Sequence, residues 1–307
     1  MPNQPSLAKR PRIAVAGATG RVGASLIANL ALDPVDVVAL TRDPQVRLMP
    51  SGVEVATVNF DAPETLSNAL RGADRLFLAH GTSERQVANE IALIDAAVAA
   101  GVSHIVKLSA MGPPTRLHPF DWHSEIEAHL SKCDVGYTVL RPSCFMSVLA
   151  RAQHPVANDT WGGTAGEGLV NLIDTRDVAD VARVALLDER FPGSQRAYHL
   201  TGPEAVSMQD VAEVLSRLLG RLVSYQHRTA ADHRGMLIGS GATEMAADLW
   251  LGLEGIFRAS VLAETTNTVT ELTGNKARSV EKWLGDNLPE FACPAPARKP
   301  QSEAASK

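Results

Sequence analysis

Short apolar runs alternate with longer stretches of helical periodicity over the first part of the chain. The runs are rich in Val, Ile and Leu, and the predicted strands cover residues 12–16, 35–41, 53–59, 75–79, 104–109, 135–140, 169–173 and 197–200. The stretches between them predict helices over residues 24–32, 62–70, 86–100, 123–131, 176–187 and 207–219. Strands that alternate with helices of this length indicate an α/β fold with helices on both faces of a parallel sheet. Because crossovers between parallel strands are right-handed, we expect a doubly wound parallel sheet.

The alternation changes after residue 143. Residues 153–168 are rich in Gly, Pro, Asn and Trp and predict a loop, and residues 222–226 indicate a short strand. From residue 230 to residue 288 the pattern is mostly helical. Ser207 is the predicted N-cap of the helix that begins there.

A glycine-rich turn separates the first predicted strand from the first predicted helix. Residues 17–23 read Gly-Ala-Thr-Gly-Arg-Val-Gly, with a glycine at every third position. Glycines let the backbone turn sharply and approach a pyrophosphate, while the helix N-terminus offers its N–H groups to the phosphates. The candidate contacts are Gly17, Ala18, Thr19, Gly20, Arg21, Val22 and Gly23. The strand-turn-helix context favours a dinucleotide fingerprint over the alternative, a tight turn with nothing bound.

Arg42 follows the second predicted strand, where an NAD site usually carries Asp or Glu. An arginine there suits the 2′-phosphate of NADP(H), and a charge-assisted hydrogen bond of this kind contributes roughly 1.5–3 kcal/mol. NADP(H) is therefore the preferred cofactor, while NAD(H) stays possible. The alternative is a solvated arginine beside Asp43, and Arg21 is a second candidate for the same phosphate.

Other polar residues end the remaining predicted strands. Asp61 is a candidate acceptor for the adenine amino group, and its alternative role is the N-cap of the next helix. His80 and Ser109 are expected beside the ribose and the nicotinamide, although His80 is equally compatible with a loop histidine. Pro142 ends a strand at the same level, and the candidate pocket-lining residues after it are Ser143, Cys144 and Phe145. Cys144 lacks an evident base, so we interpret it as a lining residue and not as a nucleophile.

Several separate motifs together resemble the NmrA-like family of atypical short-chain dehydrogenase/reductases. They are the glycine turn, Thr41-Arg42, Ser109-Ala110, the helix Trp122-His123-Ser124-Glu125-Ile126-Glu127-Ala128-His129-Leu130, the strand Tyr137-Thr138-Val139-Leu140-Arg141-Pro142, the run Leu172-Ile173-Asp174-Thr175-Arg176-Asp177-Val178-Ala179 and the element Tyr198-His199-Leu200-Thr201-Gly202-Pro203-Glu204. The resemblance covers residues 11–290. It implies an NAD(P)-binding Rossmann lobe with a small C-terminal substrate lobe. Its members include quinone, azo-dye and isoflavone-type reductases, and also catalytically silent redox sensors.

This resemblance also implies a domain division. We expect the NAD(P)-binding Rossmann core over residues 11–150, and within residues 151–292 the last Rossmann strand and helix (169–200) followed by a smaller α/β substrate lobe that covers the cleft. The tails, residues 1–10 and 293–307, are expected to be disordered.

Catalysis departs from the ordinary short-chain dehydrogenase pattern. Those enzymes use a Tyr-x-x-x-Lys pair, and none of the three tyrosines here (Tyr137, Tyr198, Tyr225) forms one. In relatives that reduce substrates, a Lys or His often lies four residues before the helix glutamate, and His123 occupies that place relative to Glu127. His123 is therefore the candidate proton donor or carbonyl-polarising group. The alternative is a histidine that only caps the helix or pairs with Glu127.

Composition excludes several classes of function. A net charge of −5, a pI near 6.0 and the lack of a basic block argue against nucleic-acid binding. No apolar run has the roughly 18 residues that a membrane span needs, and the N-terminus lacks a signal-peptide core. The three cysteines lack CxxC spacing, which favours reduced thiols in the cytoplasm. No metal is expected, since His118, His123 and His129 match no common zinc spacing.

Two functions remain in view. The first is an NADPH-preferring oxidoreductase that reduces a small quinone, enone, azo or carbonyl substrate by hydride transfer, as a monomer or homodimer. The second is a redox sensor that binds NAD(P) without turnover, which the missing tyrosine pair favours. A sugar-nucleotide epimerase is a more distant alternative, because such enzymes normally keep that pair.

Overall fold

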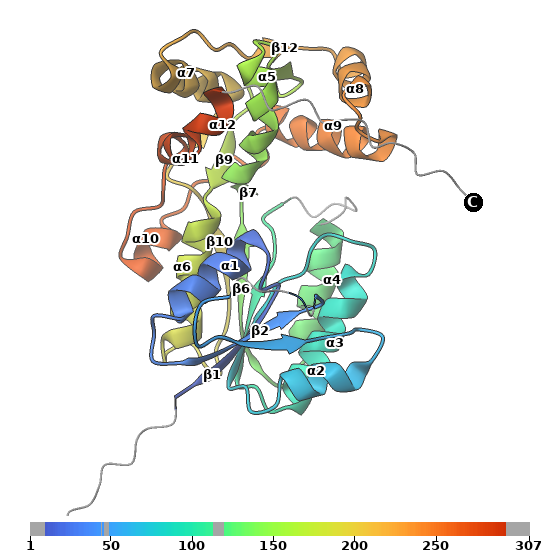
Figure 1. Cartoon of the computed structure of the whole chain (residues 1–307), viewed down its shortest axis with the longest axis vertical. Coiled ribbons are helices and arrows are strands. Elements are labelled where there is room, and N and C mark those ends of the chain that lie inside the picture. The colour runs from blue at the N-terminus through green and yellow to red at the C-terminus, as the bar shows by residue number, and fades with distance from the viewer. Residues whose placement is uncertain (1–9, 44, 46–48, 113–119, 293–307) are drawn as a thin grey trace, which may run out of the picture. The chain divides into compact units, whose positions relative to one another are not determined.

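Seven parallel strands form a central sheet in the order β10-β6-β5-β4-β1-β2-β3 (Figure 1). The computed structural model describes residues 10–43, 45, 49–112 and 120–292. The strands are β1 (Arg12–Ala16), β2 (Asp36–Thr41), β3 (Glu54–Thr57), β4 (Arg75–Leu78), β5 (His104–Leu108), β6 (Gly136–Pro142) and β10 (Gln195–Leu200). From β1 the chain first adds β2 and then β3 on one side of the sheet. It then returns to β4, on the other side of β1, and adds β5, β6 and β10 outward from there. This reversal creates a crevice at the carboxyl end of β1, where open α/β sheets bind ligands.

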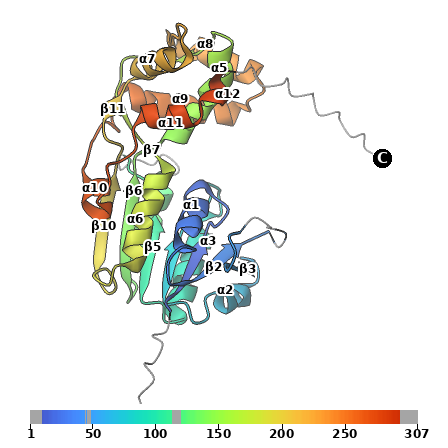
Figure 2. The same ribbon diagram turned by 60° about the vertical axis from the view of Figure 1, so that its left-hand side comes forward.

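Helices cover both faces of this sheet, as its apolar strands require. Ile13 and Val15 of β1 belong to one buried cluster, with residues of α1 and α6, whereas Ala14 and Ala16 belong to another, with residues of α2, α3 and α4 (Figure 2). These helices are α1 (Arg21–Leu30), α2 (Pro63–Ala69), α3 (Gln86–Ala99), α4 (Phe120–Leu130) and α6 (Thr175–Leu187). The predicted doubly wound α/β class is confirmed.

Two helices start earlier than their apolar periodicity predicts. The helix expected over residues 24–32 begins at Arg21, directly after its N-cap Gly20, and the helix expected over 123–131 begins at Phe120. The first turn of a helix is decided by its cap, and its side chains need not be apolar. Periodicity alone therefore misses it.

The chain divides into two units. The first comprises Met1–Phe145, Val170–Ala205 and Val261–Ser279, and the second comprises Met146–Leu169, Val206–Ser260 and Val280–Lys307. Residues 261–279 were expected in the C-terminal lobe, but α10 (Thr268–Thr273) packs on α6 and buries Val269 in the first unit. A three-stranded sheet, in the order β11-β9-β7, links β11 (Ala205–Val206), β9 (Val170–Ile173) and β7 (Cys144–Phe145). The expected tail disorder concerns residues that lie outside the described ones, apart from Arg10.

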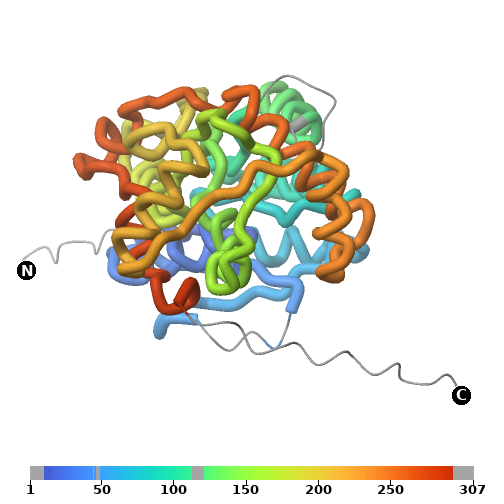
Figure 3. Tube along the Cα trace, turned by 90° about the horizontal axis from the view of Figure 1, so that it is seen from above, coloured from blue at the N-terminus to red at the C-terminus, as the bar shows by residue number. Residues whose placement is uncertain are grey.

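The second unit is mostly helical. Its elements are the 3-10 helix η1 (Met146–Ala152), α5 (Gln153–Ala157), α7 (Met208–Leu219), α8 (Ala230–Gly239), α9 (Glu244–Arg258), α11 (Val280–Asp286), α12 (Leu288–Ala292) and the short paired strands β8 (Gly162–Gly163) and β12 (Gln226–His227). Helices α8 and α9 lie side by side (orange in Figure 3). Ser207 caps α7 by accepting a hydrogen bond from the Asp210 N–H, so its predicted role is confirmed.

Two expectations for this unit were wrong. Residues 153–168 are not one loop, because they contain α5 and β8; Pro155 fits in the first turn of α5, where a backbone N–H has no helical partner. The strand expected over residues 222–226 begins only at Gln226, the first residue of β12, because the backbone of Val223 pairs with the hydroxyl of Ser216 instead. Among the described residues, no helix is both long and apolar enough to cross a bilayer.

Candidate functional site

The glycine-rich turn is closed so tightly that two of its glycines cannot be replaced without displacing backbone. Gly17 has a φ of +73°, and a Cβ on it would lie 2.8 Å from the Ala79 carbonyl oxygen. A Cβ on Gly23 would lie 2.1 Å from the carbonyl oxygen of Gly17. Gly20 donates its N–H to that same oxygen at 2.9 Å. The turn thus presses the start of α1 against the end of β1, as a dinucleotide fingerprint requires.

The N-terminus of α1 offers its backbone donors without competition from side chains. Its N-cap, Gly20, makes no side-chain capping bond, and the first turn carries no acidic residue. Arg21, the first residue of the helix, is exposed. Such a terminus, with unpaired N–H groups and a positive end of the helix dipole, favours an anion.

Arg42 and Asp61 line one hollow of about 670 Å³ in the first unit, together with Asn59, Phe60 and Arg85. Arg42 is exposed, and within the described part of the chain no carboxylate lies within ion-pair distance of it. Asp61 pairs with Arg85 at 2.6 Å, and this hydrogen bond lowers the pKa of the Asp61 carboxyl. The alternative role of Asp61 as an N-cap was wrong: Ala62 is the N-cap of α2 and makes no side-chain bond.

His80 is held by its neighbours at the end of β4. Its Nε2 lies 3.0 Å from the Asn89 amide nitrogen, and its Nδ1 lies 2.6 Å from the Gly81 carbonyl oxygen. Because the amide nitrogen donates and the carbonyl accepts, the ring carries its proton on Nδ1. Both ring nitrogens are therefore used within the fold, one by the turn and one by α3, which favours the interpretation of His80 as a loop histidine.

A fully buried lysine lies at the carboxyl end of β5. Lys107 is 0% exposed, and its ammonium forms an ion pair with the equally buried Glu90 at 2.7 Å. It also donates to the carbonyl oxygen of Leu108 and faces His123 Nδ1 at 3.2 Å. Burial lowers the pKa of Lys107, and the Glu90 charge opposes that shift. The buried ammonium thus has a carboxylate as its ion-pair partner and two further acceptors, a carbonyl oxygen and a ring nitrogen, beside it, and a buried cation requires such partners.

This contact sets the charge and tautomer of His123. Burial, together with the positive Lys107, lowers the pKa of His123 to about 3. The ring is therefore neutral at physiological pH, and Nδ1 accepts from Lys107, which leaves the proton on Nε2. The contact with Lys107 therefore favours a neutral donor over an imidazolium donor. The arrangement can instead donate one hydrogen bond from Nε2.

Glu127, expected as a partner of His123, pairs with other groups. It accepts from the Ser109 hydroxyl and forms a two-pronged ion pair with Arg141. The alternative role of His123 as a partner of Glu127 was therefore wrong. The real partner, Lys107, was missed. Its signal was a lysine in the middle of a short, mostly apolar strand, matched by Glu90 on the buried face of α3.

The residues after β6 are packed into the first unit. Ser143 is buried and donates its hydroxyl to the Asn171 side-chain oxygen at 3.2 Å, and Phe145 packs on the core cluster. Burial raises the pKa of Cys144 to about 12, so its thiol stays protonated and is a poor nucleophile. Pro142 is buried, and its carbonyl accepts the Met111 N–H at 2.8 Å. The described contacts of these residues are internal to the fold.

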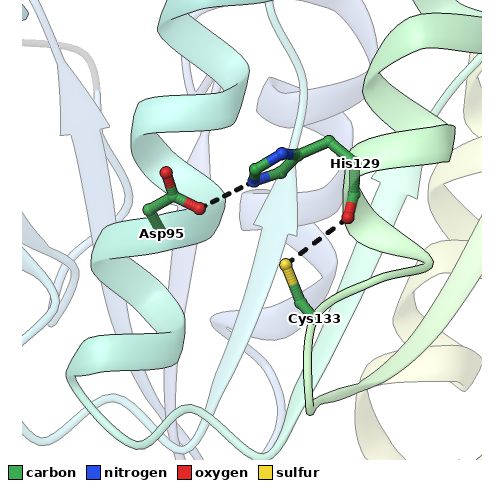
Figure 4. Close-up of side chains that lie close together, drawn as sticks. All are labelled: Asp95, His129 and Cys133. Atoms are coloured by element: carbon green, nitrogen blue, oxygen red, sulfur yellow. Dashed lines mark hydrogen bonds and ion pairs between the residues drawn. The ribbon is translucent and has the colours of Figure 1, made fainter.

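His129 has partners that its spacing in the sequence did not indicate (Figure 4). Its Nε2 lies 2.7 Å from Asp95, and the Cys133 thiol donates to the His129 carbonyl. One potential ligand atom from each of the three lies within 4.8 Å of the others. Burial and the Asp95 charge raise the pKa of Cys133, which disfavours the thiolate that binds a metal. His118 lies outside the described residues.

Known proteins resemble this chain along nearly its whole length. An NAD(P)H azoreductase of Xenophilus azovorans is 33% identical over 285 residues, which cover 91% of this chain and 99% of that protein. The solved structure of an NADPH-dependent quinone oxidoreductase of Escherichia coli, complexed with NADPH, is 25% identical, with a TM-score of 0.82 over 90% of this chain and 99% of that one. Triphenylmethane reductase of Citrobacter sp. shares the fold, with a TM-score of 0.83 at 21% identity over 91% and 99% of the two chains.

The family model that matches this chain is described as the NmrA-like family. The match extends over residues 9–253, which include the glycine-rich turn, the Lys107–His123 contact and much of the second unit. The resemblance seen in the sequence is confirmed, and the chain belongs to the NmrA-like family.

Proposed function

We propose that this protein is an NAD(P)H-dependent oxidoreductase that prefers NADPH and reduces a small quinone, enone, azo or carbonyl substrate. One observation carries the proposal: a neutral His123, with its proton on Nε2, is held by the buried Lys107 at the edge of the sheet where ligands of this fold bind. Relatives named as an azoreductase and a quinone oxidoreductase support the reaction class.

The residues of the first unit fit the cofactor. Gly17 and Gly23, where a Cβ would collide with backbone, keep the turn tight, Gly20 between them lets a pyrophosphate approach the backbone, and the open N-terminus of α1 supplies its donors. Arg42 has no competing carboxylate in the described chain and suits the 2′-phosphate. Asp61 would take the adenine amino group in competition with Arg85.

Bound NADPH would supply the hydride. His123 then stabilises the negative charge that develops on the substrate oxygen or nitrogen, through a hydrogen bond from Nε2. As that atom takes the Nε2 proton, Lys107 passes one of its own protons to Nδ1, so the ring stays neutral. When the product leaves, His123 Nε2 takes a proton from solvent and the Nδ1 proton returns to the buried Lys107, which restores the starting state. The lowered pKa of the buried lysine makes its proton transfer to Nδ1 easier than it would be from an exposed one.

Replacing Arg42 by alanine tests the cofactor preference. We expect the Kd for NADPH to rise by about ten- to a hundredfold, because a charge-assisted bond of roughly 1.5–3 kcal/mol is lost. The Kd for NADH, which lacks the phosphate, should stay within about twofold of its original value. Fluorescence titration of both nucleotides measures the two values, and an unchanged NADPH affinity would show that another residue holds the phosphate.

Replacing Gly23 by alanine tests the glycine turn. The new methyl group would lie 2.1 Å from the Gly17 carbonyl oxygen, so the turn must open and misplace the phosphate donors. We expect both nucleotides to lose at least about tenfold in affinity. The matched control is Gly252→Ala on an exposed position of α9, where a Cβ meets nothing within 4 Å. Equal affinities in both variants would contradict the proposed cradle.

The non-catalytic sensor remains the second candidate, because no described tyrosine accompanies the lysine. Lys107 contacts Glu90, Leu108 and His123, while Tyr225 lies in the second unit, where burial raises its pKa. Oxidation of NADPH in the presence of quinones, azo dyes and enones separates the two functions. Turnover supports the enzyme, and tight NADPH binding without turnover would support the sensor.

We further propose that the protein acts in the cytoplasm, as a monomer or homodimer. The support is chemical: Cys133 and Cys144 are free thiols, which a reducing compartment maintains, and NADPH-dependent reduction belongs in such a compartment.

A further inference from the structure

The second unit contains a hollow of about 730 Å³ that lies entirely within that unit. Residues of η1, α5, α8 and α9 and of the segment around β8 line it. Its apolar wall includes Leu149, Trp161, Met208, Leu237, Trp250 and Phe257. This volume is typical of pockets for small organic molecules, which are about 300–1,000 Å³.

Two tryptophans give the hollow flat walls. Trp161 is buried and meets the ring of Tyr225 edge to face, at 5.1 Å between ring centroids. The guanidinium of Arg151 lies over the ring of Trp250, 4.7 Å from its centroid. Flat aromatic surfaces of this kind suit a flat aromatic ligand, which can stack on one ring and contact the edge of another.

The charge of the lining favours an anion. Arg151 and Arg228 both line the hollow, and in the described part of the chain neither forms an ion pair. Arg228 is held by the carbonyl oxygens of Gly162 and Thr160, at 2.9 and 2.5 Å. Carbonyl oxygens leave the positive charge of this guanidinium uncompensated.

Glu254, the one acidic residue of the lining, is already surrounded by donors. Its carboxylate accepts the N–H and the hydroxyl of Thr164, both at 2.8 Å, and faces His233 Nε2 at 3.4 Å. Its negative charge is therefore held by the protein, whereas the cations of the lining are available to a ligand.

His233 supplies a second, independent sign of a binding site. Its side chain is 7% exposed and lines the hollow, and its buried Nδ1 has no hydrogen-bond partner among the described residues. A buried polar atom without a partner costs about 1–3 kcal/mol. A polar group on a bound molecule would remove that cost.

We propose that this hollow binds a flat aromatic molecule with an anionic group such as a carboxylate or sulfonate. The aromatic part lies between the tryptophan rings, and the anion pairs with Arg151. The binding of an aromatic anion does not depend on the proposed reductase function.

The test compares two probes of one shape, 2-naphthoate and its neutral amide, 2-naphthamide, by calorimetric titration of the full chain. We expect the naphthoate to bind the original protein about tenfold more tightly than the amide, and Arg151→Gln to remove that difference while the amide affinity stays the same. Arg217→Gln, an exposed arginine on α7 outside the hollow, is the matched control and should change neither. Trp250→Leu should weaken both probes to a similar extent.

Equal affinity of the two probes for the original protein would overturn the preference for an anion. Failure of both to saturate at millimolar concentration would overturn the site. A reductase that turns over neutral quinones but does not bind naphthoate contradicts this inference and leaves the proposed function intact. Tight naphthoate binding, together with no NADPH oxidation in the presence of quinones, azo dyes or enones, would contradict the proposed reductase function and leave the binding site intact.

Discussion

The His123→Phe variant is expected to lower kcat by about a hundred- to a thousandfold, the usual cost of removing a hydrogen bond that acts only in the transition state. Phenylalanine keeps the ring shape and removes both nitrogens, so the loss would reflect the Nε2 donor and not a cavity. The KM for NADPH should change little, because no cofactor contact is removed. Steady-state NADPH oxidation with a quinone measures both values, and Glu125→Ala, an exposed position on the same helix, is the control.

The pH profile distinguishes a neutral histidine from a charged one. Because the pKa of His123 is lowered to about 3, the protonation state of this ring does not change between pH 5 and pH 8. The pH dependence of kcat over this range should therefore have the same shape in the original enzyme and in His123→Phe. An ordinary imidazolium donor would instead raise kcat as the pH falls through about 6.5. Such a rise, lost in the variant, would contradict the neutral donor. Unchanged kcat in His123→Phe would remove the residue from the mechanism altogether.

Lys107→Met is expected to lower the free energy of unfolding by about 3–5 kcal/mol, the range seen when one partner of a buried ion pair is removed. Methionine has a similar length and fills the space, but Glu90 would keep a buried charge with no cation beside it. Chemical denaturation at pH 7, followed by circular dichroism, measures the change.

The double variant Lys107→Met/Glu90→Gln shows whether the buried charge is the cause. It removes both charges and keeps a polar group near Gln86, so we expect it to recover more than half of the stability lost by the single variant. A double variant as unstable as Lys107→Met would show that packing is responsible. Activity gives a second readout: the double variant should stay catalytically impaired, because His123 has lost the group that fixes its tautomer.

The fold was predictable because its signals are local. In β1, side chains alternate between Ile13 and Val15 on one face and Ala14 and Ala16 on the other, and the burial of both faces follows from a continuous apolar run. The turn after it was readable because φ near +73° at Gly17 and the lack of space at Gly23 both demand glycine. The helix starts were missed because the residues at a helix cap do not follow the apolar periodicity of the helix. The elements α5 and β8 within residues 153–168 were missed because they are too short to show a period.

The candidate site was only half predictable. Arg42 and His123 could be proposed as site residues because each lies at a fixed place relative to a strand end or a helix motif. The ion pair of Lys107 with Glu90 joins residues of β5 and α3 that no spacing connects, and the hollow in the second unit depends on segments more than a hundred residues apart.

The glycine turn, the alternation of strands and helices and the arginine after β2 were thus determined by the sequence alone, because each depends on residues that are neighbours in the chain. The tertiary structure decided what His123 can do. Burial and a lysine sixteen residues away hold its ring neutral with the proton on Nε2, and a protonation state is set by the charges and solvent around a group, which only the folded chain brings together.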